Sequence, residues 1–562
     1  MTITEDPRGY FRISFRYRPS LVDGVKRISG RRFDGQTKEW TVPRTSKREL
    51  ENFVNYVQKF ELVTWGRNGS EVTDEDRSFE LPKLRPLTVP HGLKIEPYPY
   101  QLEGIQRGLE LKRFINGDDM GLGKTMQSIA TVNIANAFPC LVICPNVVKI
   151  NWEREWSKFT DKKAMILTDS VRDSWPFFWQ TGLNQVFIVN YESLKKYFVH
   201  RIRMRKGANG KDTFTLRDVE FKNTINLFKS VIIDECHKVK SPSTQQAKFT
   251  KGISAGKEWV LGLTGTPVVN KPKDLYSQLA ILNRLSDFGG YKNFVERYCS
   301  GPNEASNLKE LNFNLWSNAF FRREKSQVLT DLPEMTRQIL TVDIDNRKEY
   351  ADAENDLISY LRKYKDATDE KIQKSMRGEV MVRIGILRDI AARGKLKAAV
   401  DFLADLLEND QKVVIFCNLH DIVDRLLKVF PKAVCITGRQ TMQEKQASID
   451  KFVRDKNTMI AIASIKAASA GVDGLQKSCS NVLFIEEPWT AADRDQAESR
   501  VHRNGLKDGA TMYHMHGKNT IDEKMWQIIE EKSKISHAVM GGVDNVQTDI
   551  VDMMANLFNS EM

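Results

Sequence analysis

The sequence predicts an α/β protein with two parallel-sheet lobes, a helical insertion between them and a small β-rich module at the N-terminus. From Tyr100 onward, short apolar runs bounded by turn residues alternate with segments of helical period, a pattern typical of parallel sheets covered by helices. The same rhythm resumes at Lys412, after charged helical sequence from Asp287 to Arg393. Because the pattern occurs twice, we expect two lobes.

The residues before Glu80 predict the small module. Polar and apolar residues alternate from Tyr10 to Tyr17 and from Glu39 to Val42, which indicates strands, and Ser46 to Phe60 favours a helix. A basic aromatic stretch, an Asp-Gly pair and a tryptophan follow one another between Arg31 and Trp40, so we expect a hairpin there.

A connector with five prolines between Pro82 and Pro99 predicts extended chain and a domain boundary. Beyond it, the strands of the two lobes are expected at the apolar runs Cys140–Cys144, Gln185–Asn190, Ser230–Ile233, Trp259–Leu263, Lys412–Cys417, Ala433–Ile436, Met459–Ala463 and Asn481–Ile485.

A protruding hairpin with a basic arm is expected between Phe198 and Phe221. Asn209-Gly210 favours a tight turn, and Lys211 to Phe221 supplies the second arm. The first arm carries four cations, Arg201, Arg203, Arg205 and Lys206. A solvated surface hairpin and a finger that contacts DNA both fit this pattern.

Composition limits the class of protein. The 562 residues, 41% of them hydrophobic, are too many for one ordinary domain. The chain has no continuous apolar run of about 18 residues and no secretion-signal pattern, so we expect a soluble intracellular protein with no membrane partner. Its seven scattered cysteines form no C-x-x-C pair, which predicts reduced, mostly buried thiols. The net charge of +12 predicts a polyanionic partner.

A phosphate-binding loop is expected from Asp118 to Thr125, immediately before the helical run Met126 to Ile134. The glycines Gly121 and Gly123 let main-chain N–H groups close around phosphates, Lys124 reaches the β and γ phosphates of ATP, and the Thr125 hydroxyl binds Mg²⁺. Asp118 stands where the usual pattern has its first glycine. Alone, the segment would also fit an ordinary turn and helix cap.

Two carboxylates, Asp234 and Glu235, end the apolar strand that begins at Val231. Ligands bind at the carboxyl ends of parallel strands, so Asp234 is predicted to hold Mg²⁺ and Glu235 to deprotonate the attacking water. Adjacent acids after a strand are commonly a solvated turn, but a phosphate loop upstream favours the functional interpretation.

Two arginines in the second lobe, Arg500 and Arg503, are spaced to share a helix face. Facing the nucleotide of the first lobe, they would stabilise charge on the transferring γ-phosphate as arginine fingers, and hydrolysis would then require the lobes to close. Without the other motifs they would be a surface charge pair.

Together these motifs resemble the SWI/SNF-like branch of the superfamily 2 helicases over roughly Tyr98 to Lys532. The resemblance implies two RecA-like lobes. It also implies that Gln101, in Tyr100-Gln101-x-x-Gly104, reads adenine, and it accounts for the missing first glycine because Asp119 to Thr125 matches that branch's own loop. Asp234-Glu235-Cys236-His237 is similar to the D-E-A-H box with cysteine in place of alanine.

The remaining motifs follow the order of that branch. Segments similar to motifs Ia, Ib, III and V imply nucleic-acid or coupling roles for five residues: Trp152, Asn190, Thr264, Ser464 and Gly471. Phe321-Arg322-Arg323-x-Lys325 is similar to the arginine-rich stretch before the second lobe. Gln496 to Gly505 resembles motif VI, which adds Gln496 to the nucleotide-binding set, although Leu506 replaces the usual glutamine. Thr520 to Glu523 is similar to the segment that braces the lobes.

Within that branch the chain resembles the HepA-related annealing helicases, because Arg32-Phe33-Asp34 to Pro43 is similar to their accessory module and the insertion is short. The expected division is an accessory module (1–82), a first lobe (83–285), a helical insertion and linker (286–394), a second lobe (395–545) and a tail (546–562).

The resulting hypothesis is an ATP-dependent and Mg²⁺-dependent DNA translocase that remodels duplex, fork or branched DNA and anneals complementary strands. We expect a monomeric motor in the nucleoid or cytoplasm of a prokaryotic or viral system, or in a nucleus if the source is eukaryotic. A strand-separating helicase, a remodeller that displaces proteins from duplex DNA, and a DNA-binding protein with a decayed motor are the alternatives. Every identified catalytic position is filled, which argues against the last.

Overall fold

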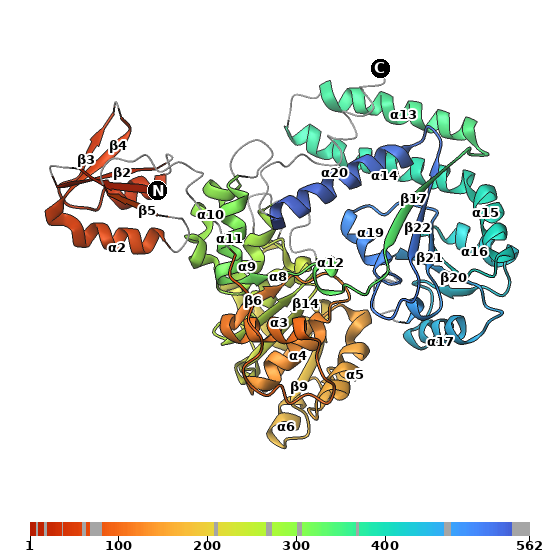
Figure 1. The fold of residues 1–562 in the computed structure, drawn as a ribbon, viewed down its shortest axis with the longest axis horizontal. Coiled ribbons are helices and arrows are strands. Elements are labelled where there is room, and N and C mark those ends of the chain that lie inside the picture. Colours follow the sequence, from red (N-terminus) through yellow and green to blue (C-terminus); the bar gives the residue numbers. More distant parts are fainter. Residues whose placement is uncertain are drawn as a thin grey trace. The chain divides into compact units, whose positions relative to one another are not determined.

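The computed structural model describes residues 1–6, 9–15, 19–35, 37–58, 63–67, 81–206, 212–265, 272–299, 306–366, 370–465 and 474–541. The contacts within the chain define two compact units, of which the first includes Met1–Arg323 and Ser536–Val546 and the second includes Glu324–Ile535. Figure 1 shows helices and strands in both. No helix among the described residues is long and apolar enough to cross a membrane.

The N-terminal module is a five-stranded sheet in the order β3-β4-β2-β1-β5. Its elements are β1 (Thr2–Glu5), β2 (Tyr10–Ser14), α1 (Pro19–Val25), β3 (Arg32–Asp34), β4 (Glu39–Pro43), α2 (Lys47–Val57) and β5 (Thr64–Arg67). The expected hairpin is confirmed, because Phe33 pairs with Trp40 across β3 and β4 and their ring centroids lie 4.9 Å apart. One face of α2 is buried, as its apolar spacing requires.

The first lobe is built on a seven-stranded parallel sheet in the order β16-β6-β15-β14-β7-β9-β8. Its strands are β6 (Arg113–Asn116), β7 (Cys140–Cys144), β8 (Ala164–Ile166), β9 (Val186–Asn190), β14 (Ser230–Asp234), β15 (Trp259–Leu263) and β16 (Phe320–Phe321). Its helices are α3 (Pro99–Leu111), α4 (Lys124–Ile134), α5 (Lys149–Phe159), α6 (Trp175–Gln180), α7 (Leu194–Phe198), α8 (Gln245–Ser254), α9 (Asp274–Ile281), α10 (Gly290–Tyr298) and α11 (Leu308–Asn318).

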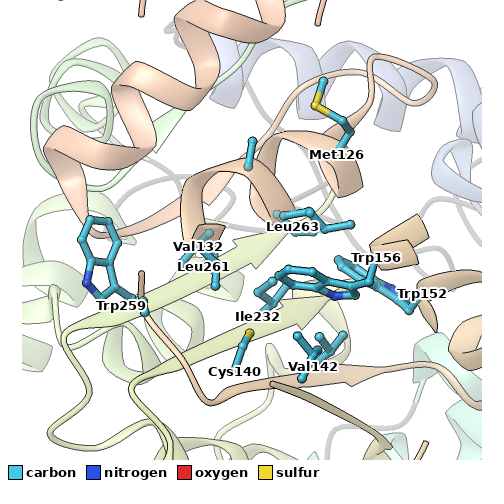
Figure 2. Close-up of a cluster of buried hydrophobic side chains, with 14 of the residues drawn as sticks. Met126, Val132, Cys140, Val142, Trp152, Trp156, Ile232, Trp259, Leu261 and Leu263 are labelled. Carbon is cyan, nitrogen blue, oxygen red and sulfur yellow. The ribbon is translucent and has the colours of Figure 1, made fainter. Parts of the chain in front are cut away.

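Every residue of β7 and β15 is buried, which is why these strands read as unbroken apolar runs. Figure 2 shows the core, in which Trp152 and Trp156 lie beside Val142 and Ile232 of the sheet. The carboxyl ends of the parallel strands therefore share one edge of a rigid sheet, and the predicted site residues follow those ends.

The basic hairpin is confirmed as well. β10 (Val199–Ile202) pairs with β13 (Val219–Phe221), and β11 (Arg205–Lys206) pairs with β12 (Asp212–Thr213), both antiparallel. Its predicted turn at Asn209-Gly210 lies outside the described residues.

The second lobe is built on a six-stranded parallel sheet in the order β17-β22-β21-β18-β20-β19. Its strands are β17 (Met335–Val342), β18 (Val413–Phe416), β19 (Val434–Ile436), β20 (Ile460–Ala463), β21 (Asn481–Phe484) and β22 (Ala510–Gly517). Its helices are α12 (Lys325–Val328), α13 (Arg347–Asp366), α14 (Glu370–Gly394), α15 (Leu396–Glu408), α16 (His420–Val429), α17 (Met442–Arg454), α19 (Ala491–Glu498) and α20 (Ile521–Gly541).

The segment expected as an insertion, 286–394, contributes to both units. Helices α10 and α11 and strand β16 belong to the first, while β17, α13 and α14 belong to the second. Apolar residues of α13 and α14, among them Tyr350 and Ile384, pack against Met525 and Ile529 of α20. The predicted two-sheet architecture with its small N-terminal sheet is thus confirmed. Five of the seven cysteines are buried, as expected.

A buried ion pair ties the second unit together. The Lys395 Nζ atom donates to Asp522 Oδ2 at 2.7 Å and to the Met515 carbonyl at 2.7 Å, and both side chains are almost completely buried. Asp522 also accepts from the Gly517 N–H.

We expect Lys395→Met to lower the free energy of unfolding by about 3–5 kcal/mol, because Asp522 would remain buried without its counter-charge. Urea denaturation followed by tryptophan fluorescence measures this change. The control is Arg425→Ala, which removes an ion pair to Asp421 whose side chains are 54% and 52% exposed, and it should cost no more than about 0.5 kcal/mol. Equal losses in the two variants would contradict the interpretation.

Candidate nucleotide-binding site

The predicted phosphate loop connects β6 to α4 and lies at the carboxyl edge of the first sheet. Gly121 and Gly123 have φ values of +91° and +80°, which glycine adopts without strain. Lys124 and Thr125 open α4, where free N–H groups and the helix dipole favour anions. The loop thus has the local geometry of a phosphate cradle.

Lys124 lies within the loop that would hold the phosphates. Its Nζ donates to the carbonyls of Asp118 at 2.6 Å and Asp119 at 3.2 Å. Burial lowers the pKa of Lys124, and the carboxylates of Glu235 and Asp118 oppose this shift. The ammonium is therefore placed among acids of the same site.

Asp118 is completely buried, and its carboxylate accepts four hydrogen bonds. Its Oδ1 accepts from the main-chain N–H and Nε of Arg323, each at 3.0 Å, and its Oδ2 accepts from Nη2 of Arg323 and, at 2.9 Å, from Gln127. Arg322 donates to Asp119 at 2.9 Å. The two consecutive arginines therefore clamp the first residues of the loop.

Gly104 makes room for this clamp. A Cβ atom there would lie 2.0 Å from Gln127 Oε1 and 2.4 Å from Arg323 Nη2. Arg323 also donates to the Tyr100 carbonyl and stacks on the Tyr100 ring. Nothing in the sequence pattern marked Arg323 as part of the nucleotide site, although the resemblance placed it in an arginine-rich stretch.

Gln101, the predicted adenine reader, is bound to the phosphate loop. Its Oε1 accepts from the Tyr98 N–H at 3.0 Å and its Nε2 donates to the Leu122 carbonyl at 3.2 Å. A Cβ at Gly123 would lie 2.4 Å from Nε2, so the glycine permits this approach. The amide group links α3 to the loop.

Asp234 ends β14 and is fixed from two sides. The Trp152 Nε1 atom donates to its Oδ2 at 2.8 Å, and the Tyr191 hydroxyl donates to its carbonyl at 2.6 Å. Burial and the adjacent Glu235 carboxylate raise the pKa of Asp234 to about 7, although Trp152 and Lys124 act in the opposite direction. The Asp234 carboxylate is therefore only partly stabilised by the positive groups around it.

A divalent cation would supply the missing positive charge beside Asp234. Mg²⁺ prefers oxygen ligands and keeps several water or phosphate oxygens, so it needs few protein ligands. The Asp234 carboxylate and the Thr125 hydroxyl are ligands of this chemistry. The residues of the site fit the ion.

Glu235 takes a left-handed conformation with φ +53°, which is uncommon for a residue with a side chain. The His237 Nδ1 atom lies 3.3 Å from Glu235 Oε2 and 3.0 Å from Thr264 Oγ1. Thr264, the predicted coupling residue at the end of β15, is buried. Polar contacts thus connect Glu235, through His237, to Thr264 at the end of β15. Residues 266–271, which follow, lie outside the described part of the chain.

The other predicted nucleic-acid or coupling residues occupy different environments. Asn190 ends β9, and its Nδ2 donates to Glu192 at 2.8 Å. Trp152 is buried against Asp234, so its side chain lies inside the lobe and not on a strand-binding surface. Ser464 follows β20, where its N–H donates to the Ile436 carbonyl. Gly471 lies outside the described residues.

The predicted shared helix face of Arg500 and Arg503 is wrong. Helix α19 carries Gln496 but ends at Glu498, and the arginines follow in turns. The N–H of Arg500 donates to the Ala497 carbonyl and that of Arg503 to the Val501 carbonyl, which are shorter steps than those of an α-helix. Both arginines are half-buried.

Charged side chains around the buried Glu498 carboxylate hold this segment within the second lobe. Arg337 of β17 donates to both carboxylate oxygens of Glu498, at 2.8 and 2.7 Å, and His514 Nε2 lies 3.4 Å from Glu498. Lys325 donates to the Ser499 hydroxyl at 2.9 Å and to the His502 carbonyl at 2.8 Å. These partners come from distant segments of the chain, so no sequence pattern linked them to the arginines.

Comparison with known proteins places these elements in a family. A family model for the SNF2-related domain matches residues 100–391, and a model for the helicase conserved C-terminal domain matches residues 394–505.

The chain is also similar to individual relatives. It is 24% identical over 94% of its length to the SWI/SNF-related matrix-associated actin-dependent regulator of chromatin subfamily A-like protein 1 of Xenopus laevis, covering 53% of that protein. It is 26% identical over 81% of its length to the human DNA annealing helicase and endonuclease ZRANB3, covering 41% of that protein. The chain thus spans about half the length of these relatives.

Among solved structures, the SWI2/SNF2 ATPase core of Sulfolobus solfataricus in complex with dsDNA matches 84% of the chain and 98% of that structure. The sequence identity is 23% and the TM-score is 0.37.

We expect Gly104→Ala to destabilise the first lobe by about 1–3 kcal/mol and to weaken nucleotide binding, because its Cβ would displace Gln127 and Arg323. Thermal unfolding with and without nucleotide measures both effects. The control is Gly385→Ala in helix α14, where a Cβ meets nothing within 4 Å, and this change should stabilise the protein by up to about 1 kcal/mol. A Gly104→Ala protein as stable as wild type would refute the packing role.

We expect Glu498→Gln to destabilise the second lobe in a pH-dependent way. Burial by itself would raise the pKa of Glu498, but Arg337 and His514 lower it to about 2, from 4.5. The charged form therefore contributes on the order of 3 kcal/mol above pH 4.5, and this contribution is lost as the pH falls from 4.5 towards 2. The difference in unfolding free energy between wild type and variant should be largest near pH 7 and shrink below pH 4.5, and a difference independent of pH would contradict this origin.

Proposed function

Because the chain belongs to the SNF2-related family and is a helicase-type ATPase, we propose that it is a DNA translocase that remodels branched or fork DNA and anneals complementary strands. The observation that carries the proposal is the grouping of Lys124, Asp234 and Glu235 at one sheet edge, with Asn190 and Thr264 at neighbouring strand ends.

ATP is the substrate of the first lobe. Lys124 and the N–H groups at the start of α4 bind its phosphates, and Gln101 contacts the adenine from α3. Glu235 accepts a proton from the attacking water as the new bond to the γ-phosphorus forms and the bond to the bridging oxygen breaks, which leaves ADP and phosphate. Thr125 and Asp234 would hold Mg²⁺, which neutralises phosphate charge when bound.

The second lobe supplies Arg500, Arg503 and Gln496 to the nucleotide when the lobes close. Arginine side chains stabilise negative charge that spreads over the transferring phosphoryl group. The pair is held by main-chain turns next to the Glu498 network, so its position depends on buried charges of its own lobe.

DNA is the proposed partner, contacted by a single motor chain at Asn190, Ser464 and Gly471. Trp152 and Thr264 act as coupling residues, because they contact Asp234 and His237 and do not face outward. Contacts to phosphates make motion independent of sequence and sensitive to salt. The similarity to a DNA annealing helicase supports the annealing part of the proposal. The proposed localisation follows that of DNA, in a nucleoid, in the cytoplasm or in a nucleus.

The test is the ATPase rate with single-stranded DNA, duplex DNA, a model fork and RNA. We expect the highest rate with the fork, and a fall in kcat of about 10²–10⁴-fold for Glu235→Gln, because water activation is lost. Lys124→Ala should abolish stimulation. Glu258→Gln, an exposed carboxylate paired with Lys112, is the matched control and should retain full activity.

The other outcomes identify the alternatives. Equal stimulation by plain duplex would favour a remodeller that displaces proteins from DNA, and unwinding of long duplexes without annealing would favour a strand-separating helicase. Stimulation by RNA alone, or full activity of Glu235→Gln, would overturn the proposal.

A further inference from the structure

The basic hairpin formed by residues 199–221 leaves the first lobe next to its carboxyl edge. Strand β9 ends at Asn190, and the chain reaches β10 through the short helix α7. Helix α8 lies beside both regions, since Gln246 near its start donates to Glu192 and Lys248, two residues later, donates to the Phe214 carbonyl. The hairpin is therefore a neighbour of the strand end proposed to contact DNA.

The base of the hairpin is packed firmly on α8. The rings of Phe214 and Phe249 stack with centroids 6.0 Å apart, and Phe214 is buried. A Cβ at Gly252 would lie 2.2 Å from the Phe221 ring and 3.1 Å from Leu216, so the glycine allows the two segments to approach closely. An ordered base argues against a loosely attached surface loop.

Asp218 fixes the polar side of the same base. Its buried carboxylate accepts from the N–H of Thr215 at 2.9 Å and from the Thr215 hydroxyl at 2.8 Å, and it forms an ion pair with Arg205. Lys206 pairs with Asp212 at 2.8 Å. Two of the four cations predicted for this arm are thus partnered within the hairpin.

Other cations of this surface have no acidic partner within 4.0 Å among the described parts of the chain. Arg201 and Arg203 are exposed on either side of the half-buried Ile202, an alternation that directs both outward. Arg217 and Lys251 are exposed and line a groove of about 590 Å³ together with Arg205 and Thr215. Unpaired cations on the hairpin and on the helix on which it packs fit a polyanion.

We propose that this surface, comprising Arg201, Arg203, Arg217 and Lys251, binds the phosphate backbone of a duplex arm of the DNA substrate, apart from the strand ends that track DNA. The inference rests on the proposed function and extends it. Proteins that bind single strands stack bases on exposed aromatic rings, whereas the rings here are used in packing the hairpin base. A basic surface without exposed aromatic rings can bind the phosphates of a duplex backbone but cannot stack on unpaired bases.

The test compares Arg201→Ala/Arg203→Ala with wild type in direct binding of duplex DNA, without ATP, and in DNA-stimulated ATP hydrolysis. We expect about tenfold weaker duplex binding near 0.1 M salt, and a log–log salt slope smaller by about 2, since two phosphate contacts are lost. The DNA concentration for half-maximal stimulation should rise equally, while kcat at saturating DNA and the basal rate stay unchanged. Arg201→Lys/Arg203→Lys should restore binding.

The matched control is Lys163→Ala/Lys229→Ala. It removes the same charge from two exposed lysines that precede β8 and β14, at the amino edge of the same sheet. Duplex binding and salt slope should be those of wild type. An equal loss in this control, or a loss restricted to single-stranded DNA or RNA, would overturn the inference, as would unchanged binding by Arg201→Ala/Arg203→Ala.

The binding measurement separates this inference from the proposed function. If wild-type ATPase activity shows no DNA stimulation but duplex binding still depends on Arg201 and Arg203, the translocase proposal fails and the surface remains. If stimulation is present and the arginines change neither binding nor half-maximal stimulation, only the surface assignment fails.

Discussion

The buried contact between Asp118 and Arg323 is the constraint on which the nucleotide site depends. A carboxylate without solvent is costly unless a cation and further donors satisfy it, and here one guanidinium, one main-chain N–H and Gln127 do so together. The same guanidinium donates to the Tyr100 carbonyl. Helix α3, helix α4, the phosphate loop and strand β16 are therefore fixed by one charge pair. Asp118 stands where the usual loop has its first glycine, and its ion pair with Arg323 holds the phosphate loop in position.

The acids of the site are held differently, and the difference matches their proposed tasks. Asp234 is held by hydrogen bonds from Trp152 and Tyr191, which lie in two helical segments, and burial together with the Glu235 carboxylate raises its pKa. Glu235 stands in a strained main-chain conformation beside His237, which in turn contacts Thr264. Two polar contacts therefore connect Glu235 to Thr264 at the end of β15. Positioning and coupling are separate properties of adjacent residues.

Local chemistry made part of this structure predictable. Buried strands such as β7 and β15 are unbroken apolar runs, and the loop around Lys124 and the acids after β14 follow from residue type and spacing. Strand β17 is mostly exposed and β22 contains polar residues, so neither has such a run. Long-range charge pairs were not predictable either, because Arg323 lies about 200 residues from Asp118 in the chain. The helix expected to carry Arg500 ends at Glu498. Helix propensity could not predict this end, because it does not depend on the long-range contacts of buried charges such as Glu498.

The cations of the molecule are either buried or exposed, and only the exposed ones are available to bind a partner. Buried cations such as Arg323 and Lys395 are paired, because an unpaired buried charge would cost several kcal/mol, so their positions report on folding. An exposed cation costs the fold almost nothing, whether paired or not. Arg201 and Arg203, which have no acidic partner within 4.0 Å among the described residues, therefore have no explanation in stability on this hairpin. The proposed recognition of an external anion would account for them, in agreement with the net charge of +12.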